Sequence, residues 1–557
     1  MFRQIAVIVL LYPLMASSMP PRQPGTDAPH SCIVGRSLDN PKDLRDYTIE
    51  TCAILIQFSD NPALAAQHTT ARYDSMFYST GVYYGQYRAG SLNDFFLENS
   101  YGTTNVTGGV AGDQWHMSVY NYSHYYDGYY MLSTGYQLAS DAVGLVDAAV
   151  DFSQYDMNND GRIDGVFVIH AGPGGEDTGD TNHCWSHAIP WFNYSTNDGV
   201  IIDGATNVPE FNLVTPALDT TLCCIGVMCH ELGHIVGLPD LYDGSRNTWG
   251  IGYWGLMGYG AWGAGGNTPW SPSHADAWCK TEVNWVTPVS ITSNTYGLRI
   301  LDSETHAVAY RVWRNGIVND TFFLLENRQN KGFDTPLPGS GLLIWHIDPR
   351  YSAYHNFVDL EEADGRDDLD NGWGYRPDPH YYHHELGDPG DPYPGDSNNT
   401  VFDSLSYPAS TDGWGHPTHV SVRNITIIGD TVVCDLIIDP LAITDHQQTT
   451  ISPLLAVAPN PFSKLINISF CIEQSAERSV LEGRESSSFR RDIELGIYDA
   501  TGRLVRDYSY AMRYAPCAMQ VVWGGCDDRG TRLGSGVYFI ELRTGEYSET
   551  RKVLLIR

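Results

Sequence analysis

The chain has 557 residues, which exceeds the size of one compact core and predicts several domains. Hydrophobic residues make up 42% of the chain and charged residues 18%, a composition typical of folded rather than disordered proteins. The formal net charge of −33 argues against nucleic acid as a partner, because nucleic-acid binding requires a basic surface. The acidity fits a solvated surface, carboxylates that bind calcium, or both.

The N-terminal residues have the pattern of a signal peptide, which we assign to residues 1–18. Arg3 precedes an apolar run at 5–15 that is too short to span a membrane, and Ala16 and Ser18 fit signal-peptidase cleavage. A buried N-terminal strand is the alternative. No later stretch approaches the ~20 apolar residues of a transmembrane helix. We therefore expect an exported protein without a transmembrane span, in which the Pro-rich residues 19–50 are a short pro-segment or linker.

Residues 51–285 alternate between strand and helix patterns and predict a mixed α/β (α+β) domain. The predicted strands lie at 53–58 and 166–171, and the predicted helices at 91–101, 143–152 and 222–237.

The pattern changes after this domain. Residues 286–440 predict a β-rich subdomain with strands at 322–326, 341–347, 420–422 and 432–436, and with a long acidic loop at 364–399. Residues 441–458 are polar and predict a linker. Residues 459–557 contain short alternating strands and turns, and predict a separate C-terminal β-sandwich.

The chemical signal of the sequence is the segment His230-Glu231-Leu232-Gly233-His234. Two histidines four residues apart lie on one face of a helix, one turn apart, and can bind one zinc ion. Glu231 lies beside His230, where its carboxylate can act as general base on a zinc-activated water.

The residues that follow the motif make a chance occurrence much less probable. Gly237 permits the left-handed conformation that ends a helix, and Pro239 cannot continue one. The chain then turns back, so that Asp240 can supply a third ligand oxygen. Three protein ligands leave one coordination position open, as catalytic zinc sites require. The alternative is that the two histidines merely pack or cap the helix.

Three neighbouring residues need separate interpretation. Cys229 points away from the face of His230 and His234, and is predicted to lie in the core. Met257, in a Gly-rich turn, resembles the Met-turn of metzincins and would form a hydrophobic floor beneath the zinc, although an ordinary core methionine is equally compatible. Tyr259 is a candidate to contact the zinc or the transition state.

The segment from Cys229 to Asp243 resembles the core of peptidase family M6, the immune inhibitor A-like metalloproteases. Further matches to that family lie at 56–60, 98–102, 170–176 and 337–346. The resemblance covers about residues 50–440. It implies a metzincin-like fold, the zinc ligands His230, His234 and Asp240, and Glu231 as base. Many relatives carry a longer pro-region than this chain shows.

A calcium site is predicted in the segment 156–164, which has the start of an EF-hand loop. The oxygens of Asp156, Asn158, Asp160 and Asp164 occupy positions 1, 3, 5 and 9, and the carbonyl of Arg162 occupies position 7. Position 12 is not Glu, so another carboxylate would have to complete the shell. The alternative is a metal-free turn rich in Asx residues.

The acidic residues Glu361, Glu362, Asp364, Asp388 and Asp391 can be read in the same two ways. We interpret them as solvated loop charges, with a second calcium site as the alternative.

The C-terminal segment resembles the sorting domain of type IX secretion and the Ig-like domain of the flagellar hook-capping protein. The matching residues lie at 459–462, 495–499, 502–505, 523–525 and 534–539. The resemblance implies a bacterial protein that meets outer-membrane secretion machinery and is then released or held at the cell surface.

Together these features predict a secreted zinc-dependent endopeptidase that uses Zn²⁺ for catalysis, is stabilised by Ca²⁺, and acts on extracellular proteins or peptides. The alternative is a surface adhesin or binding module on a degenerate peptidase fold. The complete ligand set and the base argue against that alternative.

Overall fold

The computed structural model describes residues 17–18 and 42–556, apart from thirteen short stretches. These stretches are 86–87, 127–130, 214–221, 244–247, 349–356, 371–385, 413–416, 439–452, 459–465, 473–492, 509–517, 529–530 and 545–546. The signal-peptide prediction therefore lies outside the described residues except at 17–18, as do most of the predicted pro-segment and linker. The chain forms two compact units, residues 1–441 and 442–557.

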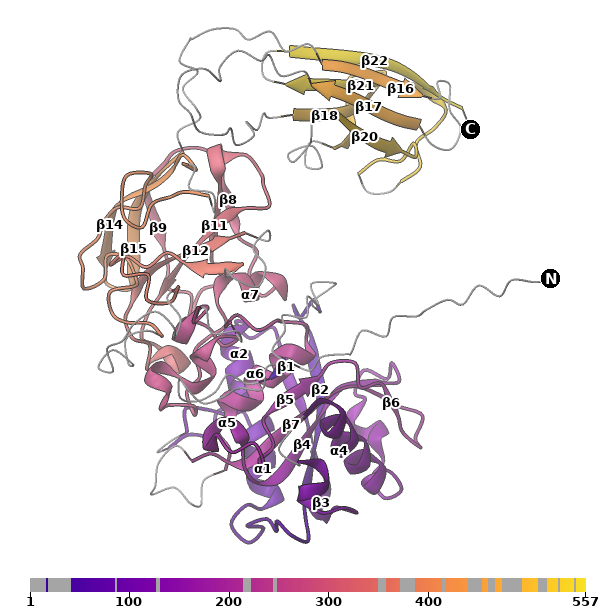
Figure 1. Ribbon diagram of the computed structural model, residues 1–557, viewed down its shortest axis with the longest axis vertical. Coiled ribbons are helices and arrows are strands. Elements are labelled where there is room, and N and C mark those ends of the chain that lie inside the picture. Colours follow the sequence, from indigo (N-terminus) through magenta and orange to yellow (C-terminus); the bar gives the residue numbers. More distant parts are fainter. Residues whose placement is uncertain are drawn as a thin grey trace, which may run out of the picture. The chain divides into compact units, whose positions relative to one another are not determined.

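The first unit is organised around a seven-stranded sheet with the order β1-β5-β7-β4-β2-β3, and β6 pairs with β7 (Figure 1). The central strands β7, β4, β2 and β3 are parallel, whereas β1, β5 and β6 are antiparallel to their neighbours. The strands are β1 (Ser17–Ser18), β2 (Thr48–Gln57), β3 (Asn105–Met117), β4 (Arg162–Pro173), β5 (His187–Ile189), β6 (Tyr194–Ser195) and β7 (Ile201–Phe211).

Helices cover both faces of this sheet. On one face, Ile235 of α6 fills the space above Gly165 and Gly204; on the other, Gly135 of α4 lies against His187 and Asn207. The helices are α1 (Thr70–Tyr78), α2 (Leu92–Asn99), α3 (Tyr122–Tyr125), α4 (Met131–Val146), α5 (Gly175–Thr178), α6 (Ile225–Ile235) and α7 (Ala277–Glu282). Short 3₁₀ turns are η1 (Phe152–Tyr155), η2 (Gly252–Trp254), η3 (Tyr259–Trp262) and η4 (Ala264–Gly266). The predicted mixed α/β class is confirmed.

Several predicted boundaries differ from the structure. The helix predicted at 143–152 belongs to α4, which begins at Met131 and ends at Val146. The predicted pro-segment 19–50 ends within strand β2, and Leu44 is fully buried. The helix predicted at 91–101 is α2, where the Ser91 side chain and Asp94 form a reciprocal capping box that fixes its start.

Residues 286–440 form two further sheets within the same unit. One has the order β13-β12-β11-β10-β8 and the other the order β14-β15-β9. Their elements are β8 (Val289–Ile291), β9 (Thr295–Ile300), β10 (Tyr310–Trp313), η5 (Arg314–Gly316), β11 (Phe322–Arg328), η6 (Gly332–Asp334), β12 (Gly341–Ile347), β13 (Val358–Leu360), β14 (Val420–Ile428) and β15 (Thr431–Ile438). The four strands predicted in this region are confirmed.

Strand β11 is buried on both faces. Phe323 and Leu325 join the core between the two small sheets, whereas Leu324 joins the main core of the unit. Since side chains alternate along a strand, Glu326 and Arg328 share the face of Leu324. The β-rich segment therefore points two charged side chains toward residues 43–286.

The second unit contains two antiparallel sheets, β16-β17-β20 and β19-β18-β21-β22, whose inner residues share one core. The strands are β16 (Pro453–Ala458), β17 (Ile466–Ile472), β18 (Ile493–Asp499), β19 (Leu504–Asp507), β20 (Ala518–Trp523), β21 (Gly536–Thr544) and β22 (Tyr547–Leu555). Strand β16 lies within 441–458, so the predicted linker extends too far.

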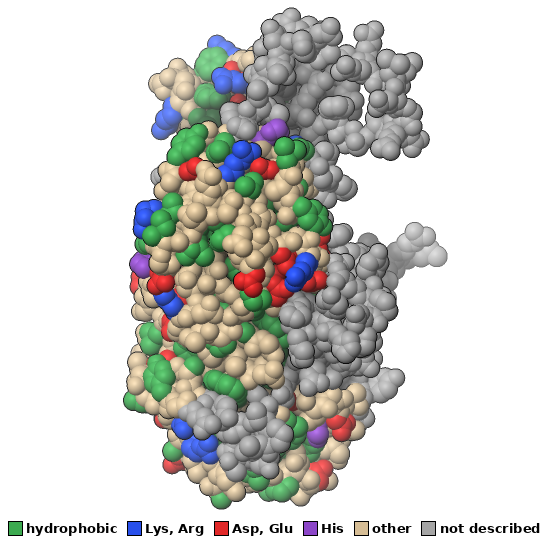
Figure 2. Space-filling view, turned by 90° about the vertical axis from the view of Figure 1, so that its left-hand side faces the viewer, with side chains coloured by type: hydrophobic (Ala, Val, Ile, Leu, Met, Phe, Trp, Pro, Cys, Tyr) green, Lys and Arg blue, Asp and Glu red, His purple; other side chains and the backbone are tan. Residues whose placement is uncertain are grey.

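On the face shown in Figure 2, the Lys and Arg side chains lie singly or beside Asp and Glu, and the described part of that face carries no continuous basic band. None of the helices in the described part of the chain has the length and apolar character needed to cross a membrane.

Candidate metal centre

Helix α6 carries the histidine motif through the middle of the first unit. All eleven of its residues are buried, and its Ile235 lies close above the glycines of β4 and β7. A Cβ atom on Gly204 would lie 2.6 Å from Ile235, so the absence of a side chain there lets the helix approach the sheet closely. The helix begins after Cys224 and ends at Ile235, two residues before the predicted end.

The side chains of His230, His234 and Asp240 converge on one point. Asp240 Oδ1 lies 3.2 Å from each histidine Nε2, and the two Nε2 atoms lie 3.2 Å apart. Zinc bonds of roughly 2.0–2.1 Å in tetrahedral geometry place neighbouring ligand atoms about 3.3 Å apart. The three residues therefore fit a zinc ion with one position left open. They form one of two groups of possible metal-binding side chains among the described residues.

Backbone carbonyls fix the orientation of both imidazole rings. His230 Nδ1 lies 3.0 Å from the oxygen of Leu256, and His234 Nδ1 lies 2.8 Å from the oxygen of Leu238. A carbonyl oxygen only accepts, so each Nδ1 carries the proton and each Nε2 keeps its lone pair for a metal. This arrangement, in which the second nitrogen is held by a carbonyl, is characteristic of metal-ligating histidines.

The charges of His230 and Asp240 also suit a metal. Burial lowers the pKa of His230, which keeps the ring neutral. Burial alone would raise the pKa of Asp240, but the two imidazoles, His234 first, bring it below its ordinary value. Metals bind a neutral imidazole and an ionised carboxylate, so His230 and Asp240 are in the states that a metal site requires.

The turn after α6 brings Asp240 back to the helix. Gly237 has φ = 100°, a left-handed conformation that favours glycine. The amide of Gly237 donates to the oxygen of His234 at 3.0 Å, and that of Leu238 donates to the oxygen of Gly233 at 2.9 Å. The predicted role of Gly237 as the end of the helix is confirmed.

Glu231 and Cys229 lie on the same helix, and both are fully buried. Cys229 belongs to the main hydrophobic core, as the sequence predicts, and burial raises the pKa of its thiol. Glu231 follows His230 directly, so its carboxylate remains the candidate base.

Met257 packs directly beneath the motif. It is fully buried, and a Cβ atom on Gly233 would lie 2.6 Å from its sulfur. Because Gly233 precedes His234, the methionine lies under the helix segment that carries both histidines, where the sequence predicted a hydrophobic floor.

Aromatic rings lie near the centre. Tyr259, at the start of η3, lies 5.8 Å from the ring of Tyr242 and 6.0 Å from that of Trp249. The ring of Tyr242 lies 6.3 Å from that of His230. The sequence indicated Tyr259 but missed Tyr242 and Trp249, because single aromatic residues without characteristic spacing give no signal.

The predicted calcium loop has the form of a turn stabilised by its own side chains. Asp156 accepts hydrogen bonds from the amides of Asp160 and Gly161, and Asn158 and Asp160 accept from amides two residues ahead. The carboxylate of Asp164 lies outside this arrangement: it is buried, and it contacts Lys42 Nζ, Tyr47 Oη and the amide of Glu50.

The interpretation of the second acidic group as solvated charges is wrong for three of its members. Glu362, Asp388 and Asp391 are at most 5% exposed. Asp391 accepts a hydrogen bond from Trp254 Nε1, and Glu362 accepts from the amides of Asp368 and Leu369. Glu362, Asp364 and Asp391 form the second described group of possible metal ligands.

Comparison with known proteins finds similarities in the larger part of the first unit. Residues 43–286 match the family model of the immune inhibitor A peptidase M6 catalytic domain. The chain is 29% identical over 257 residues to the pre-pro-metalloprotease PrtV of Vibrio cholerae, a match that covers 38% of this chain and 27% of PrtV. It is 33% identical over 143 residues to immune inhibitor A of Bacillus thuringiensis, covering 22% of this chain and 20% of that protein.

The chain thus spans 27% or less of the length of these curated relatives. Among solved structures it is similar to PorZ, a surface component of the type-IX secretion system of Porphyromonas gingivalis, at 13% identity over 43% of this chain and 22% of PorZ. The TM-score is 0.13, and we infer no structural relationship from so low a value.

Proposed function

We propose, from the premise that residues 43–286 form a peptidase M6 catalytic domain, that this protein is a secreted zinc-dependent endopeptidase that cleaves extracellular proteins. The observation that carries the proposal is the convergence of His230, His234 and Asp240, with ligand atoms 3.2 Å apart. Two neutral imidazoles and one carboxylate form the donor set of a catalytic rather than a closed structural zinc site.

The proposed chemistry assigns a role to each residue at the centre. When bound, zinc would supply a Lewis acid that polarises the scissile carbonyl and lowers the pKa of water. Glu231 accepts the proton of the attacking water on its carboxylate and returns it to the departing amide nitrogen. Tyr259 is the proposed hydrogen-bond donor to the carbonyl oxygen as negative charge develops there. Met257 keeps water from the far side of the histidines.

The C-terminal unit is proposed to direct export rather than catalysis. It has its own core of two sheets, separate from that of residues 1–441. Together with the signal-peptide pattern and the resemblance to sorting domains, this supports a bacterial protein that passes outer-membrane secretion machinery.

The proposal predicts that zinc controls cleavage of an unspecific substrate. The full chain would be stripped with a chelator, assayed on casein, and assayed again after one equivalent of zinc is returned. We expect cleavage to disappear and then return. A chain that binds zinc without cleaving casein or a peptide library would instead favour the adhesin alternative.

A further inference from the structure

We propose that Arg328 and Asp334, in the β-rich segment outside the matched catalytic domain, are positioning residues for the metal ligand His230. They act by fixing the backbone of Trp254–Leu256, whose last carbonyl orients the imidazole ring. The inference rests on the proposed zinc site and goes beyond it, because it makes residues 286–440 part of the centre.

The orientation of His230 depends on a short segment, Trp254–Leu256, in which the chain leaves the 3₁₀ turn η2 and enters the next turn. The ring donates from Nδ1 to the oxygen of Leu256 at 3.0 Å, so a shift of that carbonyl changes the direction of Nε2. Metal centres require such partners to be held in place, since ligand geometry follows from them.

Two hydrogen bonds hold this segment. The guanidinium of Arg328 donates from Nη1 to the oxygen of Trp254 at 3.0 Å. The amide of Leu256 donates to the oxygen of His274 at 3.1 Å. One bond comes from β11 and the other from the loop before α7, so two different parts of the fold hold the segment.

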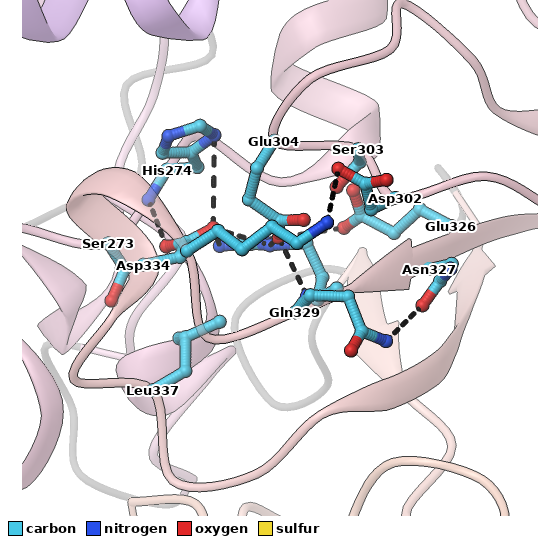
Figure 3. Close-up of polar contacts among 12 residues, drawn as sticks. Ser273, His274, Asp302, Ser303, Glu304, Glu326, Asn327, Gln329, Asp334 and Leu337 are labelled. Atoms are coloured by element: carbon cyan, nitrogen blue, oxygen red, sulfur yellow. Dashed lines mark hydrogen bonds and ion pairs between the residues drawn. The ribbon is translucent and has the colours of Figure 1, made fainter. Parts of the chain in front are cut away.

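Asp334 links Arg328 and His274, the two residues that bind this segment, into one hydrogen-bond network. Its Oδ2 accepts from Arg328 Nε at 2.8 Å and lies 2.6 Å from Nη2. Its Oδ1 accepts from the backbone amide of His274 at 2.8 Å. Figure 3 shows Asp334 beside His274, with Glu304 and Glu326 close by. The same carboxylate thus fixes the residues that hold Trp254 and Leu256.

Burial makes the hydrogen-bond network of Arg328 and Asp334 rigid. Arg328 and Asp334 are both 0% exposed. Glu304 and Glu326 lie 3.4 and 3.5 Å from the guanidinium and add negative charge around it. A buried ion pair whose partners are also hydrogen-bonded is costly to break, because each separated charge would stay buried without water to solvate it. The guanidinium therefore has little freedom to leave the oxygen of Trp254.

Only arginine can make all these contacts. A guanidinium presents five donors in a fixed plane, so it contacts Asp334 through Nε and Nη2 while Nη1 reaches Trp254. A lysine at 328 would keep the positive charge beside Asp334 but would lose this geometry. The Arg328→Lys variant therefore separates the charge from the positioning contact.

The experiment measures metal binding by the full chain carrying Arg328→Lys. The matched control is Arg314→Lys, since Arg314 pairs with Asp412 at 3.0 Å in the same segment but contacts no residue of the centre. Metal affinity is measured by chelator competition, and ligand geometry by the visible spectrum of the cobalt(II) form. We expect Arg328→Lys to weaken binding about 10–100-fold and to change the cobalt spectrum, and the control to match the native protein.

A folded Arg328→Lys chain with native affinity and a native cobalt spectrum would overturn the inference. A native chain that binds no zinc would instead overturn the proposed function, so the two failures are distinguishable.

A second measurement on the native protein covers the case in which the variant does not fold. Coupling between two sites is reciprocal. If the network of Arg328 and Asp334 favours zinc binding, zinc must therefore stabilise that network. We expect zinc to slow amide hydrogen exchange at both 254–257 and 326–336. Slower exchange at 254–257 alone would contradict the inference.

Discussion

The imidazole of His230 donates its Nδ1 proton to the carbonyl oxygen of Leu256, 3.0 Å away and 26 residues later in the chain. This bond connects the helix that carries His230 and His234 to the segment that carries Met257. It leaves Nε2 free of the proton and directed at Asp240, so the ring is oriented before any metal binds.

The close packing of helix α6 against neighbouring backbone predicts that a substitution at Gly226 strongly lowers stability. A Cβ atom there would lie 2.0 Å from the backbone oxygen of Ala261 and 2.8 Å from that of Pro269. Because backbone cannot yield as a side chain can, Gly226→Ala should destabilise the protein by about 1–3 kcal/mol or more and lower zinc affinity. Denaturant unfolding followed by circular dichroism measures the loss.

The control for this prediction is Gly144→Ala in helix α4. A Cβ atom at Gly144 would meet only the hydroxyl of Tyr194, at 3.1 Å, at the end of a side chain that can move. The better helix propensity of alanine should then leave stability unchanged or raise it by up to about 1 kcal/mol. Equal losses of unfolding free energy in the two variants would contradict the proposed close packing of α6 at Gly226.

His170 predicts a loss of stability in acid. Burial lowers its pKa to about 3, whereas an unfolded histidine titrates near 6.5. A depressed histidine pKa means that its contribution is fully present above pH ~6.5 and is lost as pH falls toward the folded pKa. From pH 6.5 to 5 this one group should remove about 2 kcal/mol.

The variant His170→Phe isolates this group, because its ring has no proton to take up. Unfolding free energies of both proteins are compared between pH 7 and pH 5, so that other titrating groups cancel. The variant should lose about 2 kcal/mol less than the native chain. Parallel pH profiles would show that His170 does not remain neutral in the folded protein.

Calcium is expected to stabilise the loop at 156–164. The carboxylate of Glu50 accepts from the amide of Asn158 at 2.9 Å, and we propose it as the replacement for the missing ligand at position 12. Calcium at a hundredfold excess over its Kd would add about 2.7 kcal/mol. We expect the melting temperature of zinc-loaded protein to rise on adding calcium and Asp160→Asn to abolish the rise, whereas Asp151→Asn, outside the loop, keeps it. An unchanged melting temperature after chelation and return of zinc, with or without calcium, would count against the site.

The convergence of His230, His234 and Asp240 could be predicted because its signal is local. The spacing of His230 and His234 fixes their common face, and Gly237 indicates where the chain turns back to Asp240. The partners that hold these ligands gave no such signal. The oxygen of Leu256 belongs to the backbone, and Arg328 is one of many charged residues until the fold brings it to Trp254.

The errors in the fold also have physical causes. The start of α4 was missed because Gly135, in the first half of the helix, weakens the helical signal. In the structure, Gly135 is required, since a Cβ atom there would lie 2.1 Å from His187. Glu362 and Asp391 are polar in sequence and predict exposure, but hydrogen bonds from backbone amides and from Trp254 Nε1 let them be buried.

The most direct test of the account is the Glu231→Gln variant of the full chain, measured for zinc content and casein cleavage together. Glutamine keeps the size of the side chain but cannot take up the proton of water. We predict one zinc ion per chain, as in the native protein, and a loss of cleavage of at least about 100-fold. Cleavage at the native rate by a zinc-loaded variant would contradict the assignment of the centre.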